Sequence, residues 1–195
     1  MPTTATPLIL SDPGYLFWAP GGTVIPTMTA AASKFSDVWP VAWINMGATE
    51  EGSTFTFSTS VEPITVAEIL SPISFPVTGQ SSKIAFSLAD FTLKSLQRAW
   101  NGVAPTTVSG SGATLVSKLS PPTPAQIVRA AIGWESLDGT LRMIGQQAIN
   151  GAEIASAFQR SPSNAVIPCE FNFEIMVGNT TAFDFYGAGT GRLGV

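Results

Sequence analysis

The fold is decided by residues 43–102, which begin WINMGATEEGSTFTFSTS (43–60) and end KIAFSLADFTLKSLQRAWNG (83–102). The glycine-bounded segment Gly47–Gly52 predicts a tight turn between two strands. Residues 54–58 alternate threonine or serine with phenylalanine, and residues 83–89 alternate in the same way around Ile84, Phe86 and Leu88. Alternation with a period of two is typical of half-buried β-strands. The stretch therefore predicts strands on both sides of a long connection.

One helix is predicted directly after these strands, at about residues 91–101. Asp90 and Thr92 each offer a side-chain oxygen for its N-cap. Gly102 follows Asn101 at the point where a left-handed C-terminal cap is needed. Three large apolar side chains fall on one helical face and are expected to be buried, namely Leu93, Leu96 and Trp100.

The remaining sequence is also rich in strand signals. Val38–Met46 reads as a strand, and residues 126–135 and 140–148 flank Asp138-Gly139, a favourable two-residue hairpin turn. The alternation at 170–177 is the clearest in the chain, and residues 182–186 are expected to close the sheet. The apolar residues of 170–177 are expected to face the core, namely Phe171, Phe173, Ile175 and Val177. The sequence thus predicts a mainly β fold, an antiparallel β-sandwich or half-barrel with one flanking α-helix at about residues 91–101.

The 195 residues are long enough for one domain with a real core. We expect an N-terminal arm at 1–13, a single β domain at 14–186 and a Gly-rich tail at 187–195. Residues 61–80, rich in proline and serine, are expected to form a long loop, and a loop of that size usually serves a function. The first residues do not resemble a signal peptide, and no apolar run is long enough to span a bilayer.

The composition favours a subunit of an assembly over a free enzyme. Hydrophobic residues make up 45% of the chain and charged residues only 11%, against roughly 25% charged residues in an ordinary soluble domain. A monomer with so little charge would have to expose large apolar surfaces, and such surfaces usually mark contacts with another chain. A compact β domain covered in serine and threonine is the simpler alternative.

The charges are unevenly distributed along the chain. The net charge is −4; acids dominate residues 37–90, where Lys83 is the only base, whereas residues 94–129 carry four bases and no acid. Such a distribution suits identical copies that meet acid to base. It argues against a protein that grips nucleic-acid phosphates, because that function requires a basic face.

Catalytic, cofactor and metal sites are not predicted. The chain has no histidine, which removes the commonest general base and metal ligand, and its single cysteine, Cys169, reads as buried packing. The adjacent carboxylates of Glu50 and Glu51 lie in a predicted turn and diverge, so a catalytic pair is not expected. The glycine-rich segment Gly187–Arg192 lacks the following helix that a phosphate-binding loop needs.

In order and spacing, residues 15–186 resemble the major tail tube proteins of long-tailed bacteriophages. The densest part of the resemblance is Trp43–Gly102, and a later part is the approach to the last long strand. The matching residues of the first part are Gly47, Thr49, Gly52, Glu62, Pro63, Glu68, Pro72, Asp90 and Thr92. Those of the second part are Phe158, Arg160, Ala165, Pro168, Glu170 and Phe171.

The resemblance implies a structural virion protein whose copies form hexameric rings. The stacked rings make a tube through which DNA leaves the capsid without specific binding. This architecture is similar to that of the tube protein of type VI secretion systems and of contractile particles. It also implies tape-measure, tail terminator and distal tail proteins as partners, assembly in the host cytoplasm, no cofactor and no membrane.

The resemblance further assigns roles to particular residues. The segment 61–80 corresponds in position to a loop that reaches the next ring, and the two terminal segments correspond to arms. The candidate inter-ring residues are Glu62, Glu68, Pro72, Pro76 and Gln80. The candidate acids of the channel wall, chosen because an acidic lumen repels phosphates, are Glu50, Glu51, Glu170 and Glu174.

Two other classes of function remain open at this stage. A capsid decoration protein or another virion β domain would share the composition but would not join its sheets into rings. A small-ligand-binding β-barrel or a hydrolase is less favoured, because the chain has neither histidine nor paired acids.

Overall fold

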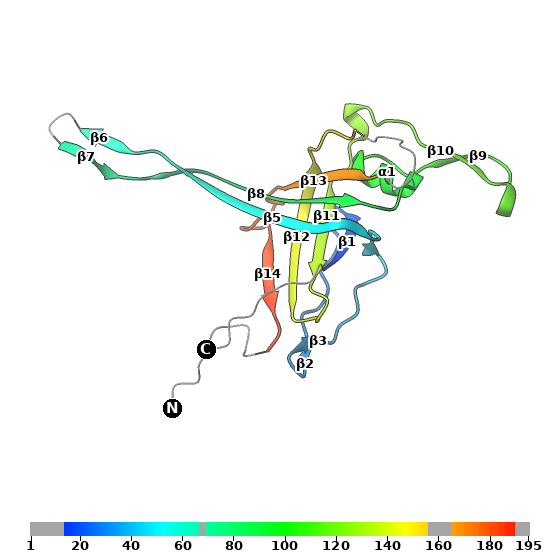
Figure 1. Cartoon of the computed structure of the whole chain (residues 1–195), viewed down its shortest axis with the longest axis horizontal. Helices are drawn as coiled ribbons and strands as arrows, with labels where there is room; N and C mark the ends of the chain where they lie inside the picture. The colour runs from blue at the N-terminus through cyan, green and yellow to red at the C-terminus, as the bar shows by residue number, and fades with distance from the viewer. Residues whose placement is uncertain (1–13, 67–68, 156–164, 190–195) are drawn as a thin grey trace.

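The computed structural model describes residues 14–66, 69–155 and 165–189. These residues form a mainly β, antiparallel structure with one α-helix, which confirms the predicted fold class (Figure 1). The strands are β1 (Tyr15–Pro20), β2 (Ala30–Ala31), β3 (Lys34–Phe35), β4 (Ile44–Asn45), β5 (Thr49–Val61), β6 (Ile64–Val66), β7 (Ile69–Ser74), β8 (Val77–Leu88), β9 (Thr106–Ser109), β10 (Val116–Lys118), β11 (Ala130–Glu135), β12 (Leu141–Asn150), β13 (Ile167–Phe173) and β14 (Asp184–Gly187). The helix is α1 (Leu93–Ala99), and two 3-10 turns are η1 (Gly112–Thr114) and η2 (Pro124–Gln126).

The largest sheet has eight strands. Seven of them follow one another in the order β4-β1-β11-β12-β13-β8-β5, and the eighth, β14, pairs with β12. Strand β12 has two neighbours on its other side: its first residues pair with β14, from Leu141 to Ile144, and its last residues pair with β13, from Ala148 to Asn150. The sheet therefore divides at β12, and the layer of β13, β8 and β5 crosses the layer of β1, β11 and β12 (Figure 1). The remaining strands form three separate two-stranded hairpins.

Strand β11 is covered on both faces. Ala130 and Ile132 belong to the larger core cluster, while Ala131, between them, belongs to a second cluster on the opposite face. A Cβ atom at Gly133 would lie 2.4 Å from the Trp39 ring, so only glycine lets that ring pack against the strand. This position explains why β11 reads as an apolar run, as expected of a central strand buried on both sides.

The β11–β12 hairpin confirms the predicted pairing around Asp138-Gly139. The connection is longer than the predicted two-residue turn, because Ser136 and Leu141 are the last residues paired across it, through a backbone hydrogen bond of 3.0 Å. The Ser136 hydroxyl donates to the Asp138 carboxylate over 2.6 Å. Gly139 has a φ of 69°, which explains glycine at that position.

The predicted helix is present, and one of its two predicted N-caps is correct. The Thr92 hydroxyl accepts a hydrogen bond of 3.1 Å from the Ser95 backbone N–H, whereas Asp90 lies outside the cap. At the other end Asn101, with a φ of 53°, occupies the left-handed position that was predicted for Gly102. Gly102 instead donates its N–H to the Gln97 carbonyl over 2.9 Å and completes a Schellman motif.

The helix buries a different face from the predicted one. Ser95, Arg98 and Ala99 are buried, Leu96 is partly buried, and Leu93 is 41% exposed. Trp100 lies outside both core clusters and lines a shallow pocket with Pro121 and Pro122. The predicted face was wrong because the buried residues Ser95 and Arg98 are polar. The spacing of apolar residues, on which the prediction relied, gives no sign of a buried arginine that stacks on an aromatic ring.

Three other predictions need correction. Only Ile44–Asn45 of the predicted strand Val38–Met46 is a strand. Within the predicted Gly47–Gly52 turn, residues 49–52 are instead the start of β5, with an irregular register between Thr49 and Ser53. Strand β13 ends at Phe173, so Ile175 and Val177, predicted to be core residues, are 60% and 98% exposed.

The Asn101 side chain also connects the end of the helix to the sheet through hydrogen bonds. Its side-chain amide donates to the Asn150 carbonyl, and its side-chain oxygen accepts from the Asn150 backbone N–H, each over 2.8 Å. The Asn150 side chain in turn donates to the Ala99 carbonyl over 2.7 Å. The end of the helix is therefore held by hydrogen bonds to the last residue of β12.

Two substitutions of Asn101 are expected to distinguish two contributions to stability, the side-chain hydrogen bonds and the steric cost of the left-handed backbone. Asn101→Gly and Asn101→Ala lose the same two bonds, but only alanine meets the steric cost of a positive φ. The alanine variant should therefore be about 1 kcal/mol less stable than the glycine variant. Urea unfolding measures the difference, and equal stabilities would contradict the left-handed conformation.

Arg142 is an ion-paired cation inside the structure. Its guanidinium Nε lies 3.2 Å from Glu135, and its Nη2 donates to the Asp37 carbonyl over 2.6 Å. The Phe35 and Trp39 rings lie over the same guanidinium, at 4.6 and 5.3 Å. The Trp39 indole N–H donates to Glu135 as well. This network holds the irregular segment before β4 against the β11–β12 hairpin.

Replacing Arg142 by leucine is expected to lower the free energy of unfolding by about 3–5 kcal/mol, because Glu135 loses its buried cation. The control is Arg129→Leu, which removes an exposed ion pair with Glu174 and should cost less than about 1 kcal/mol. Urea unfolding measures both. Equal losses would show that burial does not determine what these ion pairs contribute.

Candidate functional site

A two-stranded arm, residues 58–81, projects from the molecule (Figure 1). Strands β5 and β8 continue their pairing beyond the core, from Ser58 opposite Ser81 to Val61 opposite Val77. Strands β6 and β7 extend the ribbon, with Ile64 opposite Ser74. The arm is therefore a β-hairpin, and the prediction of a loop at 61–80 was wrong about its conformation.

The arm has no hydrophobic core in the part whose side chains the structure describes. Every residue at 58–65 and 71–81 is exposed, so both faces of this part of the ribbon meet solvent. Five large apolar side chains are about half exposed there, namely Val61, Ile64, Ile73, Phe75 and Val77. An isolated two-stranded hairpin is marginally stable in water, and exposed apolar side chains in a group mark a contact surface. These two properties identify the arm as a candidate binding element.

The sheet edge formed by β5 is a second feature of the same kind. Strand β5 has 13 residues and ends the strand order, with β8 as its neighbour. The opposite edge is formed by β4, which has only 2 residues, beside β1. A long edge strand presents unpaired backbone N–H and C=O groups and readily pairs with another chain. The edge therefore offers a surface for β-sheet extension.

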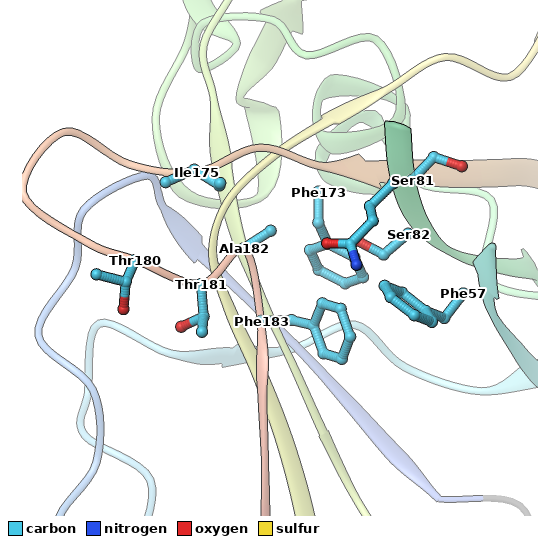
Figure 2. Close-up of a pocket in the computed structure, with 10 residues that line it drawn as sticks. Phe57, Ser81, Ser82, Phe173, Ile175, Thr180, Thr181, Ala182 and Phe183 are labelled. Carbon is cyan, nitrogen blue, oxygen red and sulfur yellow. The ribbon is translucent and has the colours of Figure 1, made fainter. Parts of the chain in front are cut away.

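A pocket of about 480 Å³ lies where the arm leaves the sheet. Figure 2 shows the rings of Phe57, Phe173 and Phe183 turned toward one another beside Ser81 and Ser82. The Phe183 ring centroid lies 5.9 Å from those of Phe57 and Phe173. No titratable side chain is among the lining residues, so the pocket can receive an apolar group but supplies no acid–base chemistry.

The same aromatic group anchors the arm. The Phe55 ring, on β5, packs edge-on against Phe183 and Phe185, with centroid distances of 4.8 and 5.2 Å. Of the two phenylalanines in the alternation at 54–58, Phe55 is partly buried against the core, whereas Phe57 is 50% exposed. Among the residues that the structure describes, the aromatic contacts of β5 end at Phe57, and the ribbon beyond it is exposed at 58–65 and 71–81.

The predicted inter-ring residues that the structure describes all lie on this arm. Glu62, Pro72, Pro76 and Gln80 are exposed on it, and Glu68 lies outside the described residues. The Pro76 carbonyl accepts a hydrogen bond of 3.1 Å from the Glu62 N–H. The structure brings these residues together on one ribbon.

The four predicted lumen acids fall into two groups. Glu50 and Glu51 are exposed at the start of β5. Glu170, by contrast, forms an ion pair of 2.8 Å with Lys83, and Glu174 accepts hydrogen bonds from Gln147 and Arg129. The Gln147 hydrogen bond, with a smaller contribution from Arg129, lowers the pKa of Glu174. Two of the four acids are thus engaged within the chain.

A second projecting hairpin was not predicted. Strands β9 and β10 pair antiparallel, and all four residues of β9 are exposed. Val108 and Val116 are more than half exposed. The β-branched residues Thr106, Thr107 and Val108 were the available signal, but the flanking Pro105 and Gly110 indicated a loop. The hairpin lies at the opposite end of the molecule from the arm (Figure 1).

Other kinds of site find little support in the described residues. There, no three potential metal ligands gather in one place. Likewise, no helix in the described part of the chain is long and apolar enough to cross a membrane. The predicted arm 1–13 and most of the tail 187–195 lie outside the described residues.

The comparisons with known proteins add no family. No family model matches the chain, and no curated protein matches its sequence. The candidate function therefore depends on the arm, the sheet edge and the resemblance described above.

Shortening the arm is expected to leave the rest of the structure folded. Joining Ser58 to Ser81 through an Asn-Gly turn removes a segment whose residues are all exposed at 59–65 and 71–80. The free energy of unfolding should change by less than about 1 kcal/mol, since loop length has a weak effect on stability. Urea unfolding and circular dichroism measure this. A variant that no longer folds would place the arm within the folding unit.

Proposed function

We propose that this protein is the major tail tube subunit of a long-tailed bacteriophage. Six copies form a ring, and stacked rings form the conduit for DNA ejection. The observation that carries the proposal is the exposed arm beside the open β5 edge. Both features are costly in an isolated molecule and become favourable when identical copies cover them.

The sheet edges support ring formation. In a closed ring the β5 edge of one copy pairs with the opposite edge of its neighbour, and no edge is left open. The contact is head to tail, because the two edges differ in length and sequence. The low content of charge supports the same arrangement, since surfaces between subunits are depleted of charged residues.

The arm supports ring stacking. It extends beyond the sheet and carries apolar side chains on a ribbon that has no core of its own. In the proposed tube the arm contacts the adjacent ring. Its apolar side chains, which are exposed in a single copy, pack there against the neighbouring subunit. Glu50 and Glu51 are the acids that remain free to face the channel, where they repel DNA phosphates.

The proposal extends to the setting of the protein. The tube is part of the virion tail, is assembled in the host cytoplasm, and ends at tape-measure, terminator and distal tail proteins. The chain acts as a structural component without catalysis or a cofactor.

Electron microscopy of the purified protein tests this function. The full chain is expected to form tubes with sixfold rings above a threshold concentration. The Ser58–Asn-Gly–Ser81 variant should form rings that do not stack, because it keeps the β5 edge from Thr49 to Ser58 but lacks the arm. Native mass spectrometry separates this outcome from a trimeric fibre or a capsid decoration protein. A full chain that stays monomeric at millimolar concentration would contradict the proposal.

A further inference from the structure

A cleft of about 410 Å³ is lined by residues of β1, β4, α1 and β10 and of the segment before β9. We call it the α1/β10 cleft. In Figure 1, α1 and β10 lie on the side of the molecule away from the arm. Its apolar side is formed by Trp18, Ile44 and Leu93, and its polar side includes Lys94, Gln97 and Arg98. Ile44 and Leu93 are more than two-fifths exposed. The cleft therefore combines an open apolar wall with positive charge.

The sequence segment that lines most of the cleft is rich in positive charge, although Asp90, just before this segment, interacts electrostatically with Arg98. Residues 91–129 contain Lys94, Arg98, Lys118 and Arg129 and no acid. Arg98 is buried with its guanidinium 5.7 Å from the Trp18 ring centroid. Lys94 lines the cleft, and Lys118, which is not a lining residue, is exposed at the end of β10 after the lining residue Ser117. Neither lysine has an ion-pair partner among the residues that the structure describes.

The arm has the complementary properties. Residues 61–80 contain Glu62 and Glu68 and no base. Glu62 is exposed, and Ile64, Ile73 and Phe75 are about half exposed on the same ribbon. The arm thus presents negative charge together with apolar side chains. Its negative charge complements the lysines of the α1/β10 cleft, and its apolar side chains match the apolar wall of that cleft.

The arm cannot meet the cleft of its own chain. The β6–β7 end of the arm and the β9–β10 hairpin lie at the two ends of the longest axis (Figure 1). A contact between arm and cleft must therefore join two copies. Because the two surfaces differ, the contact is head to tail and repeats from copy to copy.

We propose that the arm of one copy docks into the α1/β10 cleft of a copy in the adjacent ring. This inference rests on the proposed tube function and names the surface that receives the arm. Ile73 and Phe75 supply apolar side chains to the wall of Trp18, Ile44 and Leu93. Glu62 faces Lys94, which fixes the register of the contact more than its strength.

Zero-length cross-linking with a carbodiimide tests the contact with native residues. The full chain is prepared in ¹⁴N and ¹⁵N forms, mixed, assembled and cross-linked, and the peptides are identified by mass spectrometry. The expected product joins the peptide of Glu62 or Glu68 to that of Lys94 or Lys118 in a mixed-isotope pair. Arm peptides joined to Lys34 or Lys83 instead, or no mixed-isotope pair with the cleft lysines, would overturn the inference.

A charge exchange gives a second test. Glu62→Lys alone and Lys94→Glu alone place like charges in contact, and each should raise the threshold concentration for stacking at least about tenfold. The double variant Glu62→Lys/Lys94→Glu should restore it. The control is Lys34→Glu, an exposed lysine on β3, which should leave stacking unchanged. Failure of the double variant to recover would count against the pairing of Glu62 with Lys94.

These tests separate the inference from the proposed function. Tubes that form without arm–cleft cross-links leave the tube function standing and overturn the docking site. Arm–cleft cross-links in open filaments without sixfold rings support the docking site and contradict the tube function.

Discussion

The pairing of β5 with β8 is the interaction on which the rest of the structure depends. The two strands are paired from Thr49 opposite Leu88 to Val61 opposite Val77. Over the first part of this ladder, Ile84, Phe86 and Leu88 bury their side chains in the larger core cluster. Over the second part the backbone hydrogen bonds continue, but the hydrophobic core does not. One continuous ribbon thus serves both as a core layer and as an exposed arm.

The parts of the fold that sequence predicted correctly are those with a local physical cause. The hydroxyl of Thr92 caps α1, Asp138-Gly139 marks a hairpin, and alternation at 83–89 marks β8. The arm was missed because Pro63, Pro72 and Pro76 read as breakers of regular structure. In a two-stranded ribbon every strand has a free edge, so a proline without an N–H is tolerated in β7. Pro63 and Pro76 lie where the ladder is interrupted.

Sequence reasoning also failed where the burial of a side chain depends on residues far away in the sequence. Arg98 and Arg142 are charged residues that stack on aromatic rings, and no local pattern indicates that such side chains enter the interior. Ile175 and Val177 alternate like core residues, but β13 ends before them. The positions of the candidate inter-ring residues followed from their order in the sequence, whereas the α1/β10 cleft required the packing of α1, β1 and β10.

The buried thiol of Cys169 has a practical consequence. It is the chain's single cysteine, it lies in the core on β13, and burial raises its pKa to about 12. A thiol that is both protonated and inaccessible reacts slowly with maleimides and iodoacetamides. A fluorophore can therefore be attached to one cysteine introduced on the arm without removing the natural one. Energy transfer between labelled copies would then report each step of subunit addition in real time.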